Sequence, residues 1–338
     1  MIITQTPFRM SFFGGGTDME SFFTQHGGSV LSTTFDKYCY VNVRHLPRFF
    51  DYSTELSYSR TERVTNIQNI EHPAIRNAMK MLDMHEIRLT YEADLPARSG
   101  LGTSSSFAVG MLNAFYALKG KYVDKKRLAD EAIFLERELC QEAGGWQDQI
   151  AASYGGFNRI NFNTDGTYDV LPVIISPERK KKLNNNLLMF FTGFTRFSSD
   201  VQKANAGTKE THTAKEKRLL EMLSLVDKAE NILTDKNIDL DNFGKLLDHT
   251  WNLKRQTGSA VSTNSIDDLY DKGIRAGALG GKLLGAGGGG FLIFYVQPEY
   301  QISVKNAMKD LMYIPFSFED GGTRVIHYTP ETYVPLEE

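Results

Sequence analysis

Apolar residues recur in this chain with two different spacings, one typical of strands and the other typical of helices. Alternation of apolar and polar residues, or a short apolar run, is typical of strands and occurs at residues 2–13, 37–44, 87–91, 187–191 and 291–296. Apolar residues three or four positions apart predict amphipathic helices and occur at residues 124–142, 214–233 and 240–254, while a continuous apolar run predicts a further helix at 107–118. Because strands and helices do not alternate regularly, the pattern predicts an α+β fold rather than a doubly wound parallel sheet.

The clearest change of composition lies in the middle of the chain. Residues 177–182 read Pro-Glu-Arg-Lys-Lys-Lys, and three asparagines follow at residues 184–186. Such a polar run is more typical of a solvated linker than of a basic binding patch. We therefore predict two domains, at residues 1–180 and 181–338.

One segment between a predicted strand and a predicted helix has the composition of a phosphate-binding loop. Residues 96–106 read Pro-Ala-Arg-Ser-Gly-Leu-Gly-Thr-Ser-Ser-Ser. The two glycines allow a tight bend, and the N–H groups and dipole of the following helix favour anions. The Walker A spacing is absent and no lysine lies in the segment, so hydroxyl groups would contact the phosphates and a metal ion. Taken alone, the segment also fits an ordinary helix N-cap.

Two further glycine-rich segments lie near the two ends of the chain. Residues 7–18 contain Gly-Gly-Gly-Thr-Asp, and residues 283–291 contain Gly-Ala-Gly-Gly-Gly-Gly. The second has more glycines than a helix or strand interior tolerates, which indicates close backbone approach or positive φ, with a flexible linker as the alternative. The three segments in this order resemble the three motifs of the GHMP kinase superfamily, and the resemblance spans roughly the whole chain.

The resemblance implies a fold, a phosphoryl donor and a metal ion. GHMP kinases combine a ribosomal-protein-like α+β N-terminal domain with a ferredoxin-like C-terminal domain, and the active site lies between the two. The donor is ATP, and Mg²⁺ is held by a serine of the second motif and a glutamate of a later helix. The residues that match the ATP and phosphate positions are Arg98, Ser99, Gly100, Leu101, Gly102, Thr103, Ser104 and Ser105, and those that match the metal ligands are Ser104 and Glu136.

The resemblance also implies two catalytic residues. Glu136 opens a Glu-(eleven residues)-Asp-Gln pattern that ends in Asp148 and Gln149, and in the family this aspartate accepts the proton of the substrate hydroxyl. Arg9 matches a cationic position of the first motif, whose charge lies near the reacting hydroxyl and the γ-phosphate. Outside this context, Asp148 also fits a helix N-cap and Arg9 fits a surface arginine.

The first motif narrows the substrate class. Galactokinases carry Gly-Glu-His-Thr-Asp where this chain has Gly-Gly-Gly-Thr-Asp, so galactokinase is disfavoured. The first two motifs are similar to the branch that contains D-glycero-D-manno-heptose 7-phosphate kinases and the kinase domain of the much longer bifunctional fucokinases, and a chain of 338 residues favours the heptose kinases. The residues that we expect to contact the sugar are Gly14, Gly15, Gly16, Thr17, Asp18, Gly287 and Gly288.

This branch implies a reaction and leaves alternatives open. The heptose kinases phosphorylate the anomeric hydroxyl to give a 1,7-bisphosphate, on the way to a GDP-linked heptose of bacterial capsule, lipopolysaccharide or S-layer. Arg98, Arg44 and Arg196 are candidates to bind the 7-phosphate, although each fits an ordinary surface arginine equally well. The alternatives are a fucokinase-like sugar 1-kinase, a non-catalytic sugar-sensing homologue and a decarboxylase of the mevalonate diphosphate type.

Composition and charge exclude some other functions. The formal net charge of −3 gives no long-range attraction to nucleic acid or to an acidic membrane. The two cysteines, Cys39 and Cys140, have no metal-ligand spacing and fit buried thiols in a reducing compartment. No signal-peptide pattern or membrane-length apolar run occurs. We therefore expect a cytoplasmic protein with a small-molecule substrate, and a homodimer remains open.

Overall fold

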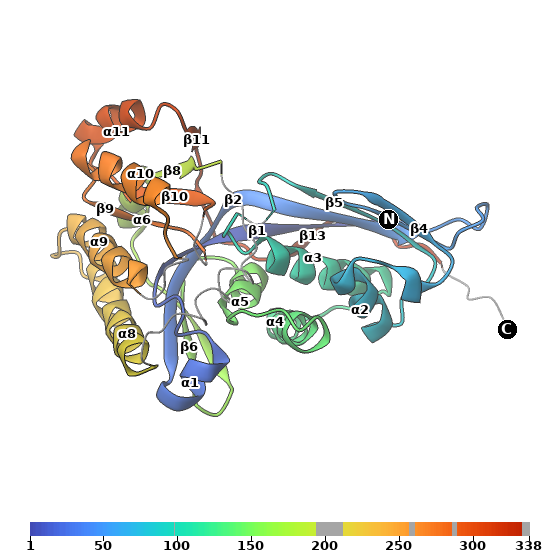
Figure 1. Ribbon diagram of the computed structural model, residues 1–338. Coiled ribbons are helices and arrows are strands. Elements are labelled where there is room, and N and C mark those ends of the chain that lie inside the picture. Colours follow the sequence, from blue (N-terminus) through green and yellow to red (C-terminus); the bar gives the residue numbers. More distant parts are fainter. Residues whose placement is uncertain (98, 194–211, 257–260, 286–288, 333–338) are drawn as a thin grey trace.

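The computed structural model of the protein contains two antiparallel-rich sheets of unequal size (Figure 1). It describes residues 1–97, 99–193, 212–256, 261–285 and 289–332. The strands of the large sheet are β1 (Ile2–Phe13), β2 (Gly28–His45), β3 (Thr54–Ser57), β4 (Thr61–Val64), β5 (Ile87–Ala93), β6 (Asn158–Phe162), β7 (Tyr168–Pro172), β12 (Phe318–Glu319) and β13 (Arg324–Tyr328). The strands of the small sheet are β8 (Leu187–Phe191), β9 (Gly280–Leu283), β10 (Phe291–Tyr295) and β11 (Met312–Ile314).

Helices cover both sheets. Beside the large sheet lie α1 (Glu20–His26), α2 (Pro73–Met81), α3 (Thr103–Leu118), α4 (Lys125–Phe134), which continues into a π-helical turn (Leu135–Leu139), and α5 (Gln147–Tyr154). Around the small sheet lie α6 (Pro177–Asn185), α9 (Asp241–Arg255), α10 (Asn264–Arg275) and α11 (Gln301–Ala307). The helix α8 (His212–Thr234) packs against α9 and against β1 and β2 of the large sheet. Single 3₁₀ turns occur at Ile67–Asn69 and Pro298–Tyr300. In Figure 1, α2, α3, α4 and α5 lie on one face of the large sheet.

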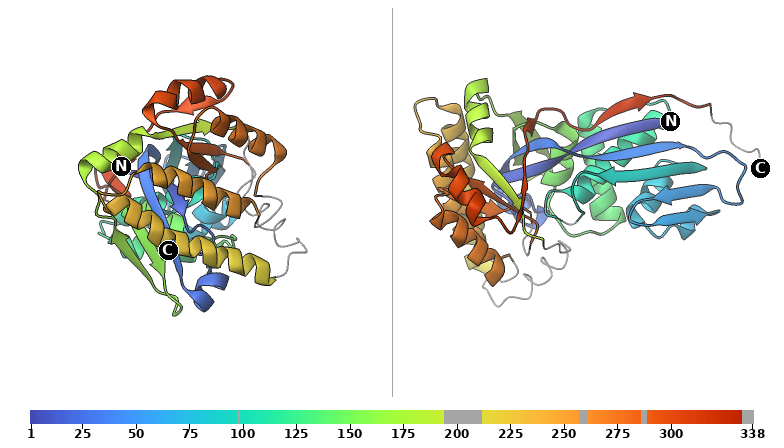
Figure 2. Two further views of the ribbon diagram at one scale, coloured as in Figure 1. Left: turned by 90° about the vertical axis from the view of Figure 1, so that its left-hand side faces the viewer. Right: turned by 90° about the horizontal axis from the view of Figure 1, so that it is seen from above.

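The long antiparallel pair β1–β2 organises the large sheet. The main path of this sheet is β13-β1-β2-β5-β3-β4, and β2 also pairs with β6 and β12. The pair runs along the length of the molecule, from the end near the small sheet to the end where the N-terminus lies (Figure 2). Its register shifts between Pro7 and Phe8 and again between Ser11 and Phe13. Such bulges bend a strand and increase its twist, and here they flank Arg9.

An aromatic cluster joins the two sheets. Phe12 and Phe13 of β1 are fully buried, and Phe243 of α9 meets both rings edge to face, at centroid distances of 5.3 and 5.1 Å. Residues of β8, β10, α8 and α9 belong to the same buried cluster as β1. Because aromatic rings of this size dominate core energetics, this contact fixes α9 and the small sheet against the end of β1.

Most of the elements predicted from periodicity are confirmed, as is the α+β class. The predicted strands lie within β1, β2, β5, β8 and β10 to within one residue, and the predicted helices at 107–118, 214–233 and 240–254 match α3, α8 and α9. The helix predicted to reach residue 142 ends earlier. Its last turn is a π-helix, and Gln141 then adopts a left-handed φ of 53°. An α-helix cannot continue through a residue in this conformation.

The linker predicted at residues 177–186 is wrong, because residues 177–185 form helix α6 and Asn186 is its C-cap. Ser176 caps it by accepting a hydrogen bond from the Arg179 amide at 3.2 Å, and Pro177 occupies the first turn, where proline is favoured. The Arg179 guanidinium donates to the carbonyls of Leu233 at 2.9 Å and Ile238 at 2.6 Å. One of the charges that indicated a solvated segment therefore satisfies the carbonyl end of α8.

The domain boundary after residue 180 stays a prediction, to which the structure adds one complication. The chain leaves the large sheet after β7 and builds the small sheet, and then β12 and β13 return to pair with β2 and β1.

Cys39 is buried, Cys140 is partly exposed, and both are free thiols. Across the described ranges, every helix is too short or too polar to cross a membrane.

We predict that Phe243→Ala destabilises the protein by about 3–5 kcal/mol, because it leaves a cavity between Phe12 and Phe13. Urea unfolding of the variant and the wild type measures this change. Phe49→Ala is the matched control, since Phe49 is 92% exposed, and it should change the free energy of unfolding by no more than about 0.5 kcal/mol. Equal effects of the two substitutions would contradict the assignment of Phe243 to the joint between the sheets.

Candidate active site

Arg9 and Asp148 form a two-point ion pair at the end of the large sheet. The Nε of Arg9 donates to Oδ1 of Asp148 at 2.7 Å, and Nη2 donates to Oδ2 at 2.9 Å. Arg9 lies on β1 and is almost fully buried, whereas the Asp148 side chain, in the first turn of α5, is 24% exposed. This fork geometry fixes the carboxylate plane. The pair therefore presents an oriented carboxylate to solvent beside a buried positive charge.

The second glycine segment lies directly against this pair. The Arg9 amide donates to the Leu101 carbonyl at 3.2 Å, and Nη1 of Arg9 donates to the Gly100 carbonyl at 2.6 Å. Gly102 caps α3 in the left-handed region, with φ of 72°. A Cβ atom on Gly102 would lie 3.3 Å from Oδ2 of Asp148. The aspartate thus lies beside the first turn of α3, whose N–H groups and dipole favour a negatively charged ligand.

The third glycine segment contacts the second. A Cβ atom on Gly285 would lie 2.3 Å from the Gly100 Cα, and one on Gly100 would lie 2.4 Å from the Leu284 carbonyl oxygen. Only glycine at these two positions allows the backbones to approach so closely. This contact brings the end of β9, in the small sheet, against the loop that precedes α3.

Two serines of α3 hold a buried glutamate. The Ser104 hydroxyl donates to Oε1 of Glu136 at 2.7 Å, and the Ser105 hydroxyl donates to Oε2 at 2.6 Å. The Gln149 side-chain amide also donates to Oε2. Glu136 is 1% exposed and lies in the π-helical turn, whereas Ser104 is exposed. Widened helical turns of this kind are frequent at functional sites, and this one directs Glu136 toward α3.

These oxygens fit a magnesium ion shared with a nucleotide. In the described part of the chain, no group of three or more His, Cys, Asp or Glu side chains could hold a metal ion by itself. Magnesium instead keeps water molecules and binds through one or two carboxylates together with substrate phosphates. The hydroxyl of Ser104 and the carboxylate of Glu136 supply two hard oxygen donors beside a predicted phosphate loop, which is the donor set that such an ion needs.

Asp18 ends the first glycine segment as a second carboxylate of the site. Its Oδ1 accepts from the Gly16 amide at 2.8 Å, and its Oδ2 accepts from the Gln147 side-chain amide at 3.0 Å. Burial raises the pKa of Asp18; the Gly16 hydrogen bond partly offsets this, and the Asp148 carboxylate raises the pKa further. Gln147, which precedes Asp148 in α5, therefore connects the two carboxylates.

Thr17, which we expected to contact the sugar, has a different position. It is fully buried, and its hydroxyl donates to the Gly14 carbonyl at 2.8 Å and accepts from the Ser29 amide at 3.1 Å. The hydroxyl is thus used within the loop, and we assign Thr17 to holding the loop in shape. Gly14, Gly15 and Gly16 lie in this loop.

Several other candidates lie elsewhere or cannot be placed. Arg44 is ten residues along β2 from Thr34, the partner of Arg9, which corresponds to on the order of 30 Å. It pairs with Glu331 at 3.4 Å, so it does not belong to this site and cannot bind a substrate there. The candidates that lie outside the described residues are Arg98, Arg196, Gly287 and Gly288.

Two lysines of the small-sheet side reach this site, and the sequence analysis missed both. Lys282 of β9 is buried and donates to the carbonyls of Ser11 at 2.8 Å and Phe12 at 2.9 Å. Burial lowers the pKa of Lys282 well below its usual value, and Lys254 and Arg9 lower it further. The sequence did contain a signal for Lys282, because it is a charged residue that stands between glycines and leucines of a buried strand. Lys254, in the last turn of α9, stands at an ordinary helical position and gave no such signal.

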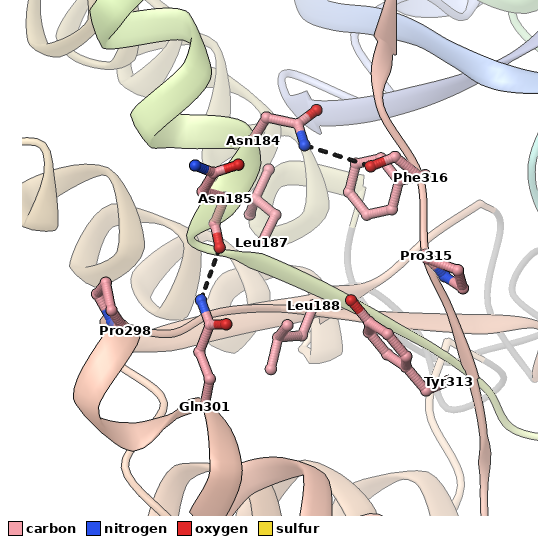
Figure 3. A pocket seen from close by; sticks show the side chains of 9 residues that line it. All are labelled: Asn184, Asn185, Leu187, Leu188, Pro298, Gln301, Tyr313, Pro315 and Phe316. Carbon is pink, nitrogen blue, oxygen red and sulfur yellow. Dashed lines mark hydrogen bonds between the residues drawn. The ribbon is translucent and has the colours of Figure 1, made fainter.

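A separate hollow of about 390 Å³ lies beside β8 and β11 of the small sheet. It is lined by parts of α6, β8 and the segment around β11, with Asn184 donating to the Phe316 carbonyl and Gln301 donating to the Asn185 carbonyl (Figure 3). None of the residues that match the glycine-rich motifs lines it. The hollow is therefore distinct from the candidate active site.

Comparisons with known proteins agree on the family. A model described as the GHMP kinases N terminal domain matches residues 59–156, and one described as the GHMP kinases C terminal matches residues 229–314. The D-glycero-alpha-D-manno-heptose 7-phosphate kinase of Campylobacter jejuni is 30% identical over 96% of this chain and 98% of its own length. The bifunctional fucokinase/GDP-fucose pyrophosphorylase of Arabidopsis thaliana is 23% identical over 85% of this chain, which spans only 29% of that protein.

Solved structures share the fold over nearly the whole chain. A D-glycero-D-manno-heptose 1-phosphate kinase from Bacteroides thetaiotaomicron superimposes with a TM-score of 0.76 at 22% identity, covering 99% of this chain and 100% of that one. A putative sugar kinase from Campylobacter jejuni gives a TM-score of 0.70 at 25% identity, covering 96% of this chain and 97% of that one.

We predict that Asp18→Asn stabilises the protein increasingly as the pH rises. The folded-state pKa of Asp18 is raised, so the wild type loses stability as the pH rises through that value, and an amide removes this loss. Oε1 of Gln147, which has no hydrogen-bond partner among the described residues, can accept from the new amide. The measurement is the Tm difference from wild type over a pH series that starts at about pH 4, near the unfolded-state pKa of an aspartate, and runs to about pH 8. Asp271→Asn, at an exposed position, should give a flat difference, and a flat or falling difference for Asp18→Asn would refute the idea.

Proposed function

We propose that this chain, which belongs to the GHMP kinase family, phosphorylates the anomeric hydroxyl of D-glycero-D-manno-heptose 7-phosphate at the expense of ATP. The product is the 1,7-bisphosphate, an intermediate toward a GDP-linked heptose of bacterial surface polysaccharide. The observation that carries the catalytic part is the Arg9–Asp148 pair beside the first turn of α3. The choice of sugar is supported by the similarity to the Campylobacter jejuni heptose kinase along nearly the whole of both chains.

We propose that Asp148 accepts the proton of the substrate hydroxyl. In the proposed reaction the anomeric oxygen attacks the γ-phosphorus of ATP, its proton passes to Asp148, and the bond between the β,γ-bridging oxygen and the γ-phosphorus breaks to release ADP. Phosphoryl transfer depends mainly on positioning and charge stabilisation. The two hydrogen bonds from Arg9 orient the carboxylate, and the Arg9 charge favours the developing alkoxide.

The phosphates of ATP would lie against the loop before α3. The N–H groups of the helix N-terminus and the hydroxyl of Thr103 would be donors there, and Ser99 is buried with a hydroxyl that has no partner among the described residues. Ser104 and Glu136 would hold magnesium, which when bound supplies positive charge to the triphosphate.

We also propose that the protein is located in the cytoplasm, because its free thiols are typical of a reducing compartment.

The sugar would lie between Asp18 and Asp148. The loop from Gly14 to Gly16 presents backbone groups, and Gln147, which precedes Asp148 in α5, holds the Asp18 carboxylate. Asp18 is suited to accept a hydrogen bond from a sugar hydroxyl, since a carboxylate offers several acceptor positions and only part of these are used by Gly16 and Gln147.

A fucokinase-like sugar 1-kinase is the second candidate, supported by the Arabidopsis relative. It would use the same catalytic residues on an unphosphorylated sugar. A non-catalytic sugar sensor is less well supported, because Arg9, Ser104, Glu136 and Asp148 are all present and lie within one site.

The first test measures ADP release with heptose 7-phosphate, fucose, galactose, mannose and mevalonate, each with and without magnesium. We expect magnesium-dependent turnover with heptose 7-phosphate and little with the others. Turnover with an unphosphorylated sugar instead would favour the fucokinase-like alternative. The absence of turnover with every compound would contradict the kinase proposal and favour the sensor.

We predict that Asp148→Asn lowers kcat by about a hundredfold to ten-thousandfold, the usual contribution of a positioned base. The change removes the proton acceptor and keeps the shape of the side chain, so nucleotide affinity should remain. Steady-state kinetics and a fluorescent ATP analogue measure the two quantities. Asp271→Asn, on the exposed side of α10, is the control, and a near-normal kcat for Asp148→Asn would exclude the base assignment.

A further inference from the structure

Lys254 reaches the candidate active site from the small-sheet side of the molecule. It lies in the last turn of α9, and its Nζ donates to the Gly285 carbonyl at 2.6 Å. Trp251, three residues earlier, is fully buried and fixes this end of the helix. The charges of Arg9, Asp18 and Asp148 all affect the pKa of Lys254. These are the charged residues that we assign to the reacting hydroxyl and the sugar.

The two cations meet where the two glycine loops touch. Arg9 donates to the Gly100 carbonyl and Lys254 donates to the Gly285 carbonyl, and the backbones of these two glycines are in contact. Arg9 and Lys254 therefore approach the same point from the two sides of the molecule. A phosphoryl group in transfer between the loop before α3 and Asp148 would pass this point.

The charge of Arg9 alone is poorly suited to stabilise that group. Two of its N–H donors are directed to Asp148 and a third to Gly100, so the guanidinium is matched to a carboxylate of opposite charge. The transferred phosphoryl group carries negative charge on its equatorial oxygens. A second cation at this point would add charge stabilisation that the Arg9–Asp148 pair does not supply.

We propose that Lys254 is a catalytic residue that contacts an equatorial oxygen of the transferred phosphoryl group and stabilises its charge; this rests on the kinase function proposed above. An ammonium group has three N–H donors on a flexible stem, so it can keep the Gly285 bond and turn toward an incoming oxygen. Because Lys254 belongs to α9, whereas Asp148 and the phosphate loop belong to the large-sheet side, the site is complete only when both parts are in contact.

The other nearby lysine has a different position. Lys282 is buried and directs its Nζ to the carbonyls of Ser11 and Phe12. It ties the small sheet to β1 and supports the bend beside Arg9. The neighbour of Lys254 in sequence, Arg255, points elsewhere and pairs with Asp267 at 3.0 Å beside the Tyr270 ring. Arg255 is thus a matched control from the same helical turn.

The test compares Lys254→Met, Lys254→Arg and Arg255→Met in the full chain, with the sugar that gives turnover in the wild type. Removing one preorganised charge donor from a transition state typically costs a hundredfold to a thousandfold in kcat. We expect Lys254→Met to lose about a hundredfold or more in kcat, Lys254→Arg to recover part of it, and Arg255→Met to stay within about twofold of wild type. The KM values for ATP and sugar should change much less than kcat.

A second readout separates catalysis from structure. MgADP with aluminium fluoride and sugar imitates the phosphoryl group in transfer, so Lys254→Met should weaken this complex about as much as it lowers kcat, while leaving MgADP affinity nearly unchanged. A merely structural role would lower both affinities together, or would lower the Tm without changing their ratio. Either result would overturn the proposal.

The pH profile gives a third readout. Burial and the Arg9 charge lower the pKa of Lys254 to about 8, against the opposing effect of Asp18 and Asp148, and Lys282 is the other cation nearby. Since the charged form is the active one, kcat/KM should fall above about pH 8 in the wild type, and this fall should be absent in Lys254→Arg.

The outcomes also distinguish this proposal from the one on which it rests. Lack of wild-type turnover with every sugar would refute the kinase function. Wild-type turnover together with a near-normal kcat for Lys254→Met would refute only the role of Lys254. A raised KM for a phosphorylated sugar with unchanged kcat would identify Lys254 as a substrate anchor and would also overturn its catalytic assignment.

Discussion

The backbone contact between Gly100 and Gly285 is the constraint on which the site depends. A side chain at either position would meet the other backbone at less than 3 Å, so the two loops can touch only where both residues are glycine. Their carbonyls receive Arg9 from one side and Lys254 from the other. Phe243, packed on Phe12 and Phe13, holds the helix that carries Lys254 in register with β1. One steric requirement thus places groups from two sheets at a common point.

The charges gathered at this point are unusual for a protein with a net charge of −3. Arg9 and Lys254 lie near Asp18 and Asp148, and Lys282 lies near these two cations, in a largely buried volume. Isolated charges are unfavourable in such surroundings, and the lowered lysine pKa values and the raised Asp18 pKa express this penalty. A negatively charged phosphoryl group would relieve the excess of positive charge. The site therefore favours an anionic ligand through local arrangement, although the protein as a whole does not.

The sequence predicted what local patterns determine. Strands, most helices and the glycine-rich segments follow from periodicity and from backbone conformations that only glycine tolerates, and the family motifs brought Arg9, Ser104, Glu136 and Asp148 together. The predictions that failed concerned contacts between elements that are distant in the sequence. Residues 177–186 are polar, yet they form a helix because Ser176 caps it and Arg179 meets the end of α8. Arg44 lies on β2, the strand that pairs with Arg9, but at the end of β2 that is far from Arg9. Lys254 was missed because nothing in a helical pattern shows which carbonyl a distant loop will offer.

The return of β13 to the edge of β1 makes the large sheet depend on segments that are far apart in the chain. β1 pairs with β2 on one side and with β13 on the other, so closing this edge is a contact of high sequence separation, which forms slowly in folding. Until β13 pairs, that edge of β1 presents unpaired backbone groups, a condition that favours association with other strands. The small sheet does not need this pairing to form, because its described strands all lie between residues 187 and 314. A partly folded chain that lacks only β13 would therefore expose the edge of β1 to strands of other molecules.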